Sequence, residues 1–289
     1  VNDERRLLFI LQHPFILKLY GTFQDSDRVY LLTEAVTGGE LWSVIYEGLS
    51  GHPVDGVSVE HARFYSAIVI DALGHMHMKG CAYRDLKPEN IMVDAQGYLR
   101  LIDLGFAKKI PFVVEIEGQL QVHPKSYTMC GTPEYLAPEF IFNTGHDHSA
   151  DYWAFGILAF ELIAGHTPFA PPDAQADMTN LFTAIACVKR DGIQFPKDFD
   201  RKAKGTVARD LVVKLLHPEP SQRLGNLSGR TDDIKQHEYF QGIDWSDLTK
   251  KQIPGPWIPP PNGMDADPNQ DPGTDVARYT GDQEKFREF

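Results

Sequence analysis

Residues 83–105 constrain the fold of this chain more than any other stretch. Apolar runs at 91–93 and 98–102 flank a turn that contains Gly97. Two apolar runs around a glycine-containing turn predict a short β-hairpin. Asn90 and Asp103 are equidistant from the turn centre, which lies between Gln96 and Gly97. Antiparallel pairing is therefore expected to bring both residues to the same open end of the hairpin, a few ångströms apart.

The loop before this hairpin carries two further chemical groups, Asp85 and Lys87. The oxygen atoms of Asn90 and Asp103 are hard ligands, which suit a Mg²⁺ ion whose coordination is completed by phosphates. The free carboxylate of Asp85 suits a base that accepts a hydroxyl proton. The stretch therefore predicts phosphate chemistry, although these residues alone are also compatible with a solvated acidic hairpin that has no function.

The composition limits the classes of protein to consider. The chain has 289 residues, 42% hydrophobic and 24% charged, as expected for a globular protein of one or two domains. Its net charge of −12 argues against a nucleic-acid surface. The acidic excess suits basic substrates, or only aids solubility. We find no apolar run long enough for a transmembrane helix. The three cysteines show neither metal-ligand spacing nor a disulfide pattern, which predicts a cytoplasmic protein.

Three motifs carry a resemblance to a known family. Residues 83–90 read Tyr-Arg-Asp-Leu-Lys-Pro-Glu-Asn, residues 103–105 read Asp-Leu-Gly, and residues 137–139 read Ala-Pro-Glu. In this order they resemble the catalytic loop, the magnesium motif and the end of the activation segment of protein kinases. Together they disfavour the functionless hairpin, because the combined motif set is far more specific than any single triplet.

Within the AGC group of kinases, the chain resembles the cyclic-nucleotide-dependent enzymes. Residues 20–23, 38–43 and 105–110 look like the cGMP-dependent kinase, whereas the Phe-x-x-Phe at 286–289 looks like the cAMP-dependent kinase. On balance the resemblance favours the cGMP type. It implies an α+β, bilobal fold in which the large lobe (37–241) is complete. Residues 1–36 would be a remnant of the small lobe from helix C onward, and residues 242–289 would be an AGC-type tail.

The resemblance assigns catalytic roles to four residues, with ATP and Mg²⁺ as cofactors. Asp85 would orient the substrate hydroxyl and accept its proton, and Lys87 would steady the transferring phosphoryl group. Asn90 and Asp103 would hold Mg²⁺. Leu104 stands where the family usually has Phe, which keeps an apolar side chain at that position.

The nucleotide site would begin at the end of the second strand. The backbone groups of Glu34 and Val36 would hydrogen-bond the adenine edge. Thr33 would be the gatekeeper residue behind the adenine, although it could also be an ordinary strand threonine. The resemblance adds three more residues to the nucleotide site, namely Glu40, Met92 and Asp103.

The substrate site would select basic residues before the target Ser or Thr, because carboxylates bind arginine through charge-assisted hydrogen bonds. The acidic residues implied are Glu40, Glu89 and Glu161. An apolar residue after the target would meet Met129 and Leu136, and Thr132 would also contact the substrate. The expected substrates are proteins with an Arg-Arg-x-Ser/Thr-apolar pattern.

The regulatory residues implied are Glu4, Arg84, Lys108 and Thr128. Arg84 and Lys108 are cations that a phosphate on Thr128 would neutralise, which would order the loop. Ser126 is a second candidate for the same phosphate, and Thr128 could also be an ordinary loop residue. Glu4 would pair with a lysine upstream of this chain. Residues 111–124 lengthen the loop for a purpose that the sequence does not indicate.

Two features expected of an active kinase are not found in these 289 residues, the Gly-x-Gly-x-x-Gly loop and the strand lysine. We therefore expect the chain to be a fragment that binds ATP weakly and turns over poorly by itself. A cyclic-nucleotide-binding regulatory domain or subunit would be a partner outside this chain. Two alternatives stay open, a non-catalytic pseudokinase and a truncated kinase-fold binding module.

Hydrophobic periodicity and helix caps predict the main helices and strands, and the resemblance predicts two buried contacts. Helices are expected at residues 1–11, from a Ser58 cap to about 77, and from a Ser149 cap through 165. Strands are expected at 15–23 and 28–36. The resemblance further implies that Asp151 holds the catalytic-loop backbone and that Glu139 and Arg223 form a buried ion pair.

Overall fold

The computed structural model describes residues 2–25, 28–48, 56–111, 113–116, 119–122, 125–170 and 177–260, with only the backbone for 113–116 and 119–122. The Phe-x-x-Phe motif at 286–289 lies outside the described residues. The helices are α1 (Asn2–Ile10), α2 (Leu41–Tyr46), α3 (Val59–Met78), α4 (Pro138–Ile141), α5 (Ser149–Ala164), α6 (Met178–Ala186), α7 (Val188–Asp191), α8 (Phe199–Lys202), α9 (Val207–Leu215), α10 (Thr231–Lys235) and α11 (Trp245–Thr249).

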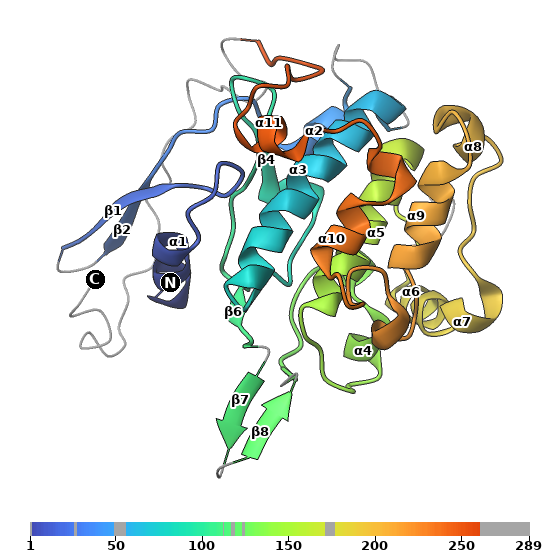
Figure 1. Cartoon of the computed structure of the whole chain (residues 1–289), viewed down its shortest axis with the longest axis horizontal. Helices are drawn as coiled ribbons and strands as arrows, with labels where there is room; N and C mark the ends of the chain where they lie inside the picture. Colours follow the sequence, from blue (N-terminus) through green and yellow to red (C-terminus); the bar gives the residue numbers. More distant parts are fainter. Residues whose placement is uncertain are drawn as a thin grey trace.

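The strands form four antiparallel pairs, β1–β2, β3–β6, β4–β5 and β7–β8. Their bounds are β1 (Leu19–Gln24), β2 (Val29–Thr33), β3 (Cys81–Ala82), β4 (Ile91–Val93), β5 (Leu99–Leu101), β6 (Lys108–Lys109), β7 (Val113–Ile116) and β8 (Gln119–Val122). The mixture of helices and strands confirms the predicted α+β class. Figure 1 shows a large helical body with α1, β1 and β2 to one side of it.

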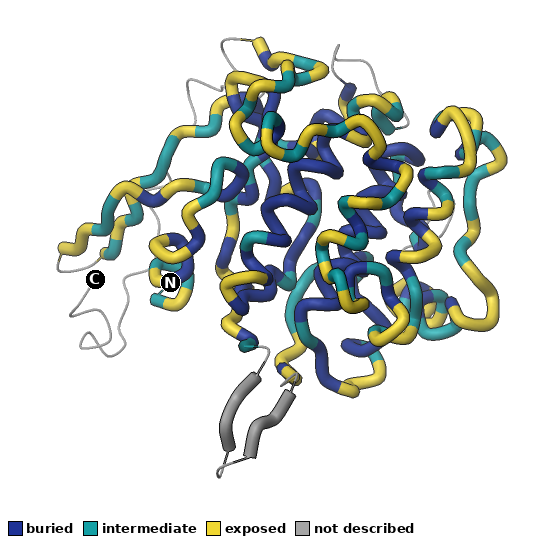
Figure 2. Tube along the Cα trace, in the orientation of Figure 1, coloured by how far each residue is buried: buried dark blue, intermediate teal, exposed yellow. Residues whose placement is uncertain are grey.

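Helix α5 is the centre of the helical body. All of its residues are buried, and α3 and α9 pack against it (Figure 2). The sequence predicted this placement, because a helix that is apolar on every side needs partners on every side. A Cβ atom on Gly156 would lie 2.8 Å from Cβ of Leu215, so glycine permits the close approach of α5 to α9.

The expected helix starts are only partly right. Ser58 caps α3 by accepting a hydrogen bond from the amide of His61, as predicted. The predicted Ser149 cap is wrong, because Ser149 is already the first residue of α5. Its amide donates to Oδ1 of Asp147 at 2.8 Å, so the residue two positions earlier satisfies this helix terminus.

The first residues form the expected helix α1, whose Leu7 and Leu8 are buried. The predicted strands at 15–23 and 28–36 are shorter than expected. Residues 15–17 pair with β5 instead, since the amide of Leu17 donates to the carbonyl of Leu101 and the amide of Leu101 donates to the carbonyl of Phe15. This pairing joins the first segment of the chain to the hairpin of the candidate site.

The loop after β6 contains a further hairpin, formed by β7 and β8. β7 and β8 pair from Val113 opposite Val122 to Ile116 opposite Gln119, and Figure 1 shows them projecting away from the helical body. Most of the predicted 111–124 insertion is therefore hairpin backbone. In the described part of the chain, no helix combines the length and apolar character needed to cross a membrane.

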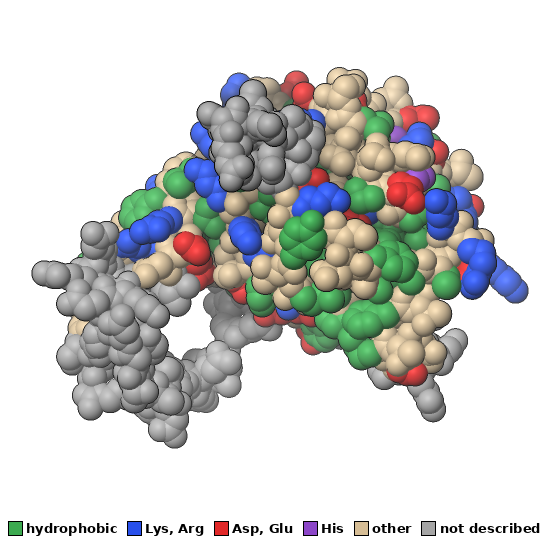
Figure 3. Space-filling view, turned by 90° about the horizontal axis from the view of Figure 1, so that it is seen from below, with side chains coloured by type: hydrophobic (Ala, Val, Ile, Leu, Met, Phe, Trp, Pro, Cys, Tyr) green, Lys and Arg blue, Asp and Glu red, His purple; other side chains and the backbone are tan. Residues whose placement is uncertain are grey.

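On one face of the molecule (Figure 3), charged side chains are not gathered by sign. On the face shown in Figure 3, acidic and basic side chains are interspersed with hydrophobic and neutral ones. An ion pair is buried inside the fold. The guanidinium of Arg223 is fully buried and donates to both carboxylate oxygens of Glu139, at 2.8 and 2.9 Å. It also donates to the carbonyl of Ser149, and this links the segment after the loop to α5.

We expect Glu139→Ala to lower the free energy of unfolding by about 3–5 kcal/mol, because it leaves the Arg223 charge buried without its partner. Urea denaturation of both proteins measures this loss. Glu219→Ala is the matched control, since Glu219 pairs with Lys189 at the exposed surface. It should cost at most about 1 kcal/mol. Equal losses in the two variants would contradict the prediction.

Candidate active site

The β4–β5 hairpin forms as predicted, but its register differs by one residue. Ile91 is opposite Leu101, and the amide of Ile102 donates to the carbonyl of Asn90 at 3.0 Å. Asn90 is therefore opposite Ile102, and Asp103 lies one residue beyond the expected pair. The turn is centred on Gln96, because the carboxylate of Asp94 accepts hydrogen bonds from the amides of Gln96 and Tyr98.

Asp85 is the most constrained side chain at the open end of this hairpin. It is buried, and the amide nitrogen of Asn90 donates to its Oδ2 at 2.7 Å. The hydroxyl of Thr132 donates to its Oδ1 at 3.0 Å, and Nζ of Lys87 lies 3.7 Å from its Oδ2. The structure thus brings together four residues with different predicted roles. Asp85 and Lys87 were predicted to act in catalysis, Asn90 to hold the metal ion and Thr132 to contact the substrate. A carboxylate fixed by neutral donors and an ammonium group is well placed to receive a proton from a hydroxyl.

The donor set fits a magnesium ion better than a fully protein-coordinated metal. Among the described residues, no group of three or more His, Cys, Asp or Glu side chains is placed to hold a metal ion. Because Asn90 donates through its amide nitrogen, its amide oxygen keeps the lone pairs that a cation uses. Asp103 is exposed, with its Oδ1 accepting from the amide of Gly105. Two oxygen ligands suit Mg²⁺, which retains waters and binds phosphates.

Helix α1 directs Glu4 toward this region. Burial raises the pKa of Glu4, and the negative charge of Asp103 raises it further. Leu104, next to Asp103, is buried, in agreement with an apolar side chain at that position. The structure therefore brings the predicted helix-C glutamate within electrostatic reach of the predicted magnesium ligand.

Asp151 on α5 holds the backbone of the catalytic loop through hydrogen bonds. Its Oδ2 accepts from the amide of Tyr83 at 2.8 Å, and its Oδ1 accepts from the amide of Arg84 at 2.7 Å. Arg84 has a φ of 70°, in the left-handed region that is unfavourable for a residue with a side chain. Hydrogen bonds to a fully buried carboxylate hold the loop in this conformation.

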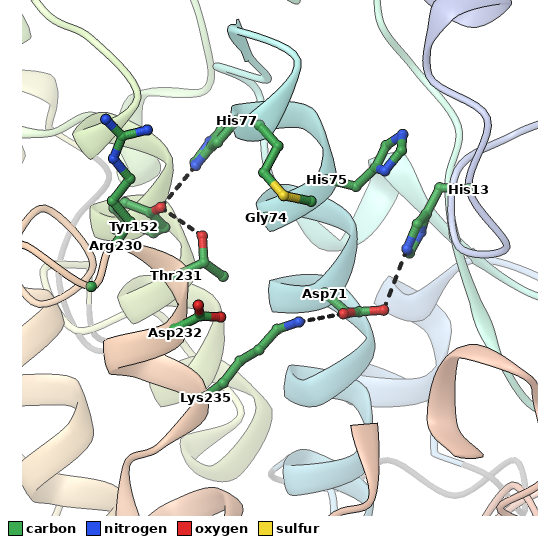
Figure 4. Close-up of a pocket in the computed structure, with 12 residues that line it drawn as sticks. His13, Asp71, Gly74, His75, His77, Tyr152, Arg230, Thr231, Asp232 and Lys235 are labelled. Atoms are coloured by element: carbon green, nitrogen blue, oxygen red, sulfur yellow. Dashed lines mark hydrogen bonds and ion pairs between the residues drawn. The ribbon is translucent and has the colours of Figure 1, made fainter. Parts of the chain in front are cut away.

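A chain of hydrogen bonds continues behind Asp151. Nε2 of His77 lies 2.7 Å from Asp151 Oδ2, and Nδ1 of His77 lies 3.0 Å from the hydroxyl of Tyr152. That hydroxyl is 2.9 Å from the hydroxyl of Thr231. His77, Tyr152 and Thr231 line a cavity of about 210 Å³ (Figure 4). The support of the catalytic loop therefore extends from α5 through α3 to the start of α10.

The predicted adenine-binding residues follow β2. β2 ends at Thr33, and the amide of Glu34 still donates to the carbonyl of Lys18 at 3.0 Å, so the backbone of Glu34 pairs with the segment before β1. The side chain of Glu34 accepts from the amide of Lys18 and pairs with Arg100 at 3.2 Å, which ties this segment to β1 and β5. Met92 on β4 forms a bridge with Glu40, so these two predicted nucleotide-site residues are neighbours. None of these contacts tests the predicted roles.

The predicted substrate-binding acids differ in exposure. Glu89 is exposed, whereas Glu161 is buried and accepts hydrogen bonds from the hydroxyls of Tyr46 and Tyr135. Burial raises the pKa of Glu161 to about 7, and the charges of Glu89 and Glu134 contribute. The sequence patterns did not indicate Tyr46 or Glu134 as site residues. Glu134 lies between the predicted substrate residues Thr132 and Leu136, whereas no motif includes Tyr46.

The two residues of the predicted apolar subsite differ in exposure. Leu136 is buried, but Met129 is 61% exposed. Leu136 instead contributes to a small cavity together with Thr132 and Gly131. Met129 is thus available at the surface, and its part in substrate binding stays a prediction.

The predicted cationic pair points toward Ser126. Nη1 of Arg84 lies 3.4 Å and Nζ of Lys108 lies 3.2 Å from the Ser126 hydroxyl. Ser126 is 4% exposed and is bridged to His146, which sequence reasoning also missed. Thr128 is exposed two residues later. Burial and the charge of Arg84 lower the pKa of His146 to about 4, so its imidazole adds no positive charge at neutral pH.

Comparison with known proteins agrees with this arrangement. Residues 1–240 match the protein kinase domain family. This chain belongs to that family. The chain is 41% identical over 257 residues to cGMP-dependent protein kinase 2 of Homo sapiens, covering 89% of this chain and 30% of the relative. It is 38% identical over 260 residues to cAMP-dependent protein kinase type 3 of Saccharomyces cerevisiae, covering 90% and 58%.

A third relative is the cAMP-dependent protein kinase catalytic subunit of Dictyostelium discoideum. It is 39% identical over 259 residues, covering 90% of this kinase chain and 35% of the relative. The kinase chain thus spans between about a third and somewhat over half of the length of these relatives. The resemblance to cyclic-nucleotide-dependent kinases that the motifs indicated is confirmed.

We expect Asp151→Asn to loosen the catalytic loop of the kinase domain, because the new NH₂ group cannot accept from one of the two backbone amides. Hydrogen exchange of the Tyr83 and Arg84 amides should accelerate roughly tenfold or more, as expected for the loss of a hydrogen bond worth about 1–3 kcal/mol. Asp147→Asn is the matched control, since Asp147 receives a single backbone amide at a helix start. Unchanged exchange at both amides would show that Asp151 does not hold the loop.

Proposed function

We propose that this chain transfers the γ-phosphoryl group of ATP to Ser or Thr hydroxyls in proteins. The observation that carries the proposal is the convergence of Asn90, Thr132 and Lys87 on the buried carboxylate of Asp85. Membership of the protein kinase family supports it. The proposed division is a small-lobe part at 1–36, a large lobe at 37–241 and a tail at 242–289.

In the proposed mechanism, Asp85 orients the substrate hydroxyl and accepts its proton as the oxygen attacks the γ-phosphorus. Lys87, close to the same carboxylate, stabilises negative charge on the transferring group. Asn90 and Asp103 would hold Mg²⁺, which neutralises phosphate charge when it is bound. The backbone at Glu34 and Val36, with Thr33, Glu40 and Met92 around it, would receive the nucleotide.

The proposed substrates are proteins with arginine or lysine before the target residue. Support comes from the acidic residues Glu40, Glu89 and Glu161 and from the net charge of −12. Met129, Thr132 and Leu136 would contact the residues around the target. The names of the relatives support a cyclic-nucleotide-dependent type, and we favour the cGMP type. Its regulatory domain or subunit would lie outside this chain, and the three free cysteines suit the reducing cytoplasm.

We further propose that a phosphate on Thr128 activates the kinase domain. Thr128 is exposed and therefore accessible to a modifying enzyme, whereas Ser126 is buried. Arg84 and Lys108 already converge two residues away, where they now contact the Ser126 hydroxyl. A phosphate would replace that hydroxyl as their partner and order the segment. Glu4 would contribute by pairing with the strand lysine expected upstream of this chain.

The test of the activity uses the 289-residue chain, radiolabelled ATP with Mg²⁺, and a peptide with two arginines before its serine. Asp85→Asn should lower the rate by roughly 10²- to 10⁴-fold, because the proton acceptor is lost. Asp191→Asn is the matched control, since Asp191 is an exposed aspartate that pairs with its neighbour Arg190. Equal rates in the two variants would contradict the proposed role. Weak incorporation by the unmodified chain would agree with the missing glycine-rich loop and strand lysine, whereas no incorporation at saturating ATP would favour the non-catalytic binding module.

The test of the phosphate site compares Thr128→Ala with Ser126→Ala. Thr128→Ala should lower kcat/KM roughly tenfold, since a charge-assisted bond contributes about 1.5–3 kcal/mol. Ser126→Ala should have a smaller effect, because it removes only a neutral acceptor. Mass spectrometry of the purified chain locates the phosphate. A phosphate on Ser126 with full activity of Thr128→Ala would transfer the role to Ser126.

A further inference from the structure

Glu161 has an unusual environment for a residue expected to receive a substrate arginine. It lies on α5, is 3% exposed, and uses both carboxylate oxygens. The hydroxyl of Tyr46 donates to Oε1 at 2.5 Å, and the hydroxyl of Tyr135 donates to Oε2. Two neutral donors therefore bind the carboxylate, one at each oxygen.

The two tyrosines differ in their freedom to move. Tyr135 is 7% exposed and belongs to the short helix η2 (Pro133–Tyr135), within the core cluster. Tyr46 is half-buried at the end of α2, and its ring packs on Trp42 with centroids 5.2 Å apart. Trp42 is itself 38% exposed. Of these two side chains, Tyr46 lies at the margin of the core and is the more exposed, so it is the one that can move outward more easily.

The surroundings of this carboxylate are acidic. Glu89, from the short helix η1 (Pro88–Asn90), and Glu134, from η2, both repel negative charge on Glu161. Glu134 accepts a hydrogen bond from Thr167 at 2.6 Å. Burial and Glu161 itself raise the pKa of Tyr46, so its hydroxyl keeps its proton and donates. A guanidinium that entered here would meet three carboxylates.

We propose that Tyr46 is a specificity-determining residue of the substrate site, whose hydroxyl competes with a substrate arginine for Oε1 of Glu161. The proposal rests on the function proposed above. A guanidinium carries several donors in a fixed plane and binds a carboxylate through two of them. Each oxygen of Glu161 could accept a second hydrogen bond, but the carboxylate is only 3% exposed, so a guanidinium reaches Oε1 when the Tyr46 side chain moves outward. Tyr46 thereby weakens the selection of arginine at this subsite.

The competition has a pH dependence whose sign follows from Glu161. Its pKa is raised to about 7, mainly by burial, so below that pH the carboxyl is protonated and attracts arginine weakly. The selection of arginine should therefore rise as pH increases through 7. The groups that face the carboxyl are Tyr46 from α2, Tyr135 and Glu134 from η2, and Glu89 from η1.

The first experiment measures kcat/KM at pH 8 for paired peptides in which each arginine before the serine is replaced in turn by alanine. For the arginine that reaches Glu161, Tyr46→Phe should raise the Arg/Ala ratio roughly tenfold, because one charge-assisted hydrogen bond of about 1.5–3 kcal/mol is released to the substrate. Tyr20→Phe is the matched control, since Tyr20 is an exposed tyrosine on β1. Adding Glu161→Gln to Tyr46→Phe should abolish the gain.

The second experiment does not depend on turnover. It measures Kd of the same peptides and titrates Glu161 by NMR of ¹³C-labelled carboxyl groups, with Glu161→Gln assigning the signal. Tyr46→Phe should raise the pKa of Glu161, because a donor to its ionised form is lost. It should also move the pH dependence of the Arg/Ala ratio upward. An unchanged or lower ratio at a pH where the NMR titration shows Glu161 ionised in both proteins would overturn the role of Tyr46.

The two proposals fail in different ways. If no peptide is phosphorylated by any variant, the proposed kinase activity fails, while the Kd ratios and the Glu161 titration still decide the role of Tyr46. If all peptides are phosphorylated and the Arg/Ala ratios are equal in Tyr46→Phe and Tyr20→Phe, the activity stands and the inference about Tyr46 is wrong.

Discussion

The buried carboxylate of Asp151 is the interaction on which the candidate active site depends. Burial opposes its ionisation, but hydrogen bonds from His77 and from the amides of Tyr83 and Arg84 outweigh this effect and keep its pKa below the usual value. A buried charge without such donors would be costly. Asp151 and the catalytic loop depend on each other. The backbone amides stabilise the buried charge of Asp151, and the same hydrogen bonds hold Arg84 in its left-handed conformation.

The sequence predicted best those features that depend on neighbours along the chain. The hairpin turn, the Ser58 cap and the fully buried α5 follow from local patterns that need no partner to be read. The register of β4 and β5 did not, because the Asp94 carboxylate shifts the turn centre to Gln96. The pairing of residues 15–17 with β5 joins segments more than 80 residues apart, and the strand pattern alone does not specify the partner.

The candidate site also contains contacts between neighbours along the chain, which the sequence predicted, and contacts between distant segments, which it did not. Asp85, Lys87 and Asn90 meet because they lie within six residues of one another, at one end of a hairpin. Tyr46 meets Glu161 across 115 residues, and no pattern around Tyr46 indicates this contact. Contacts of this kind follow from how α2 packs near α5, and packing is decided by the whole core. Residues that tune a site are therefore harder to find from sequence than residues that define it.

Two buried glutamates illustrate how the partner of a charge determines what the charge can do. Glu139 faces the guanidinium of Arg223, so its charge is cancelled within the fold and its contribution is structural. Glu161 faces the hydroxyls of Tyr46 and Tyr135, which stabilise its ionised form without cancelling the charge. Its electric field therefore persists at the edge of α5. A cation that took the place of Tyr46 would offset the charge of Glu161, whereas the charge of Glu139 is already offset by Arg223.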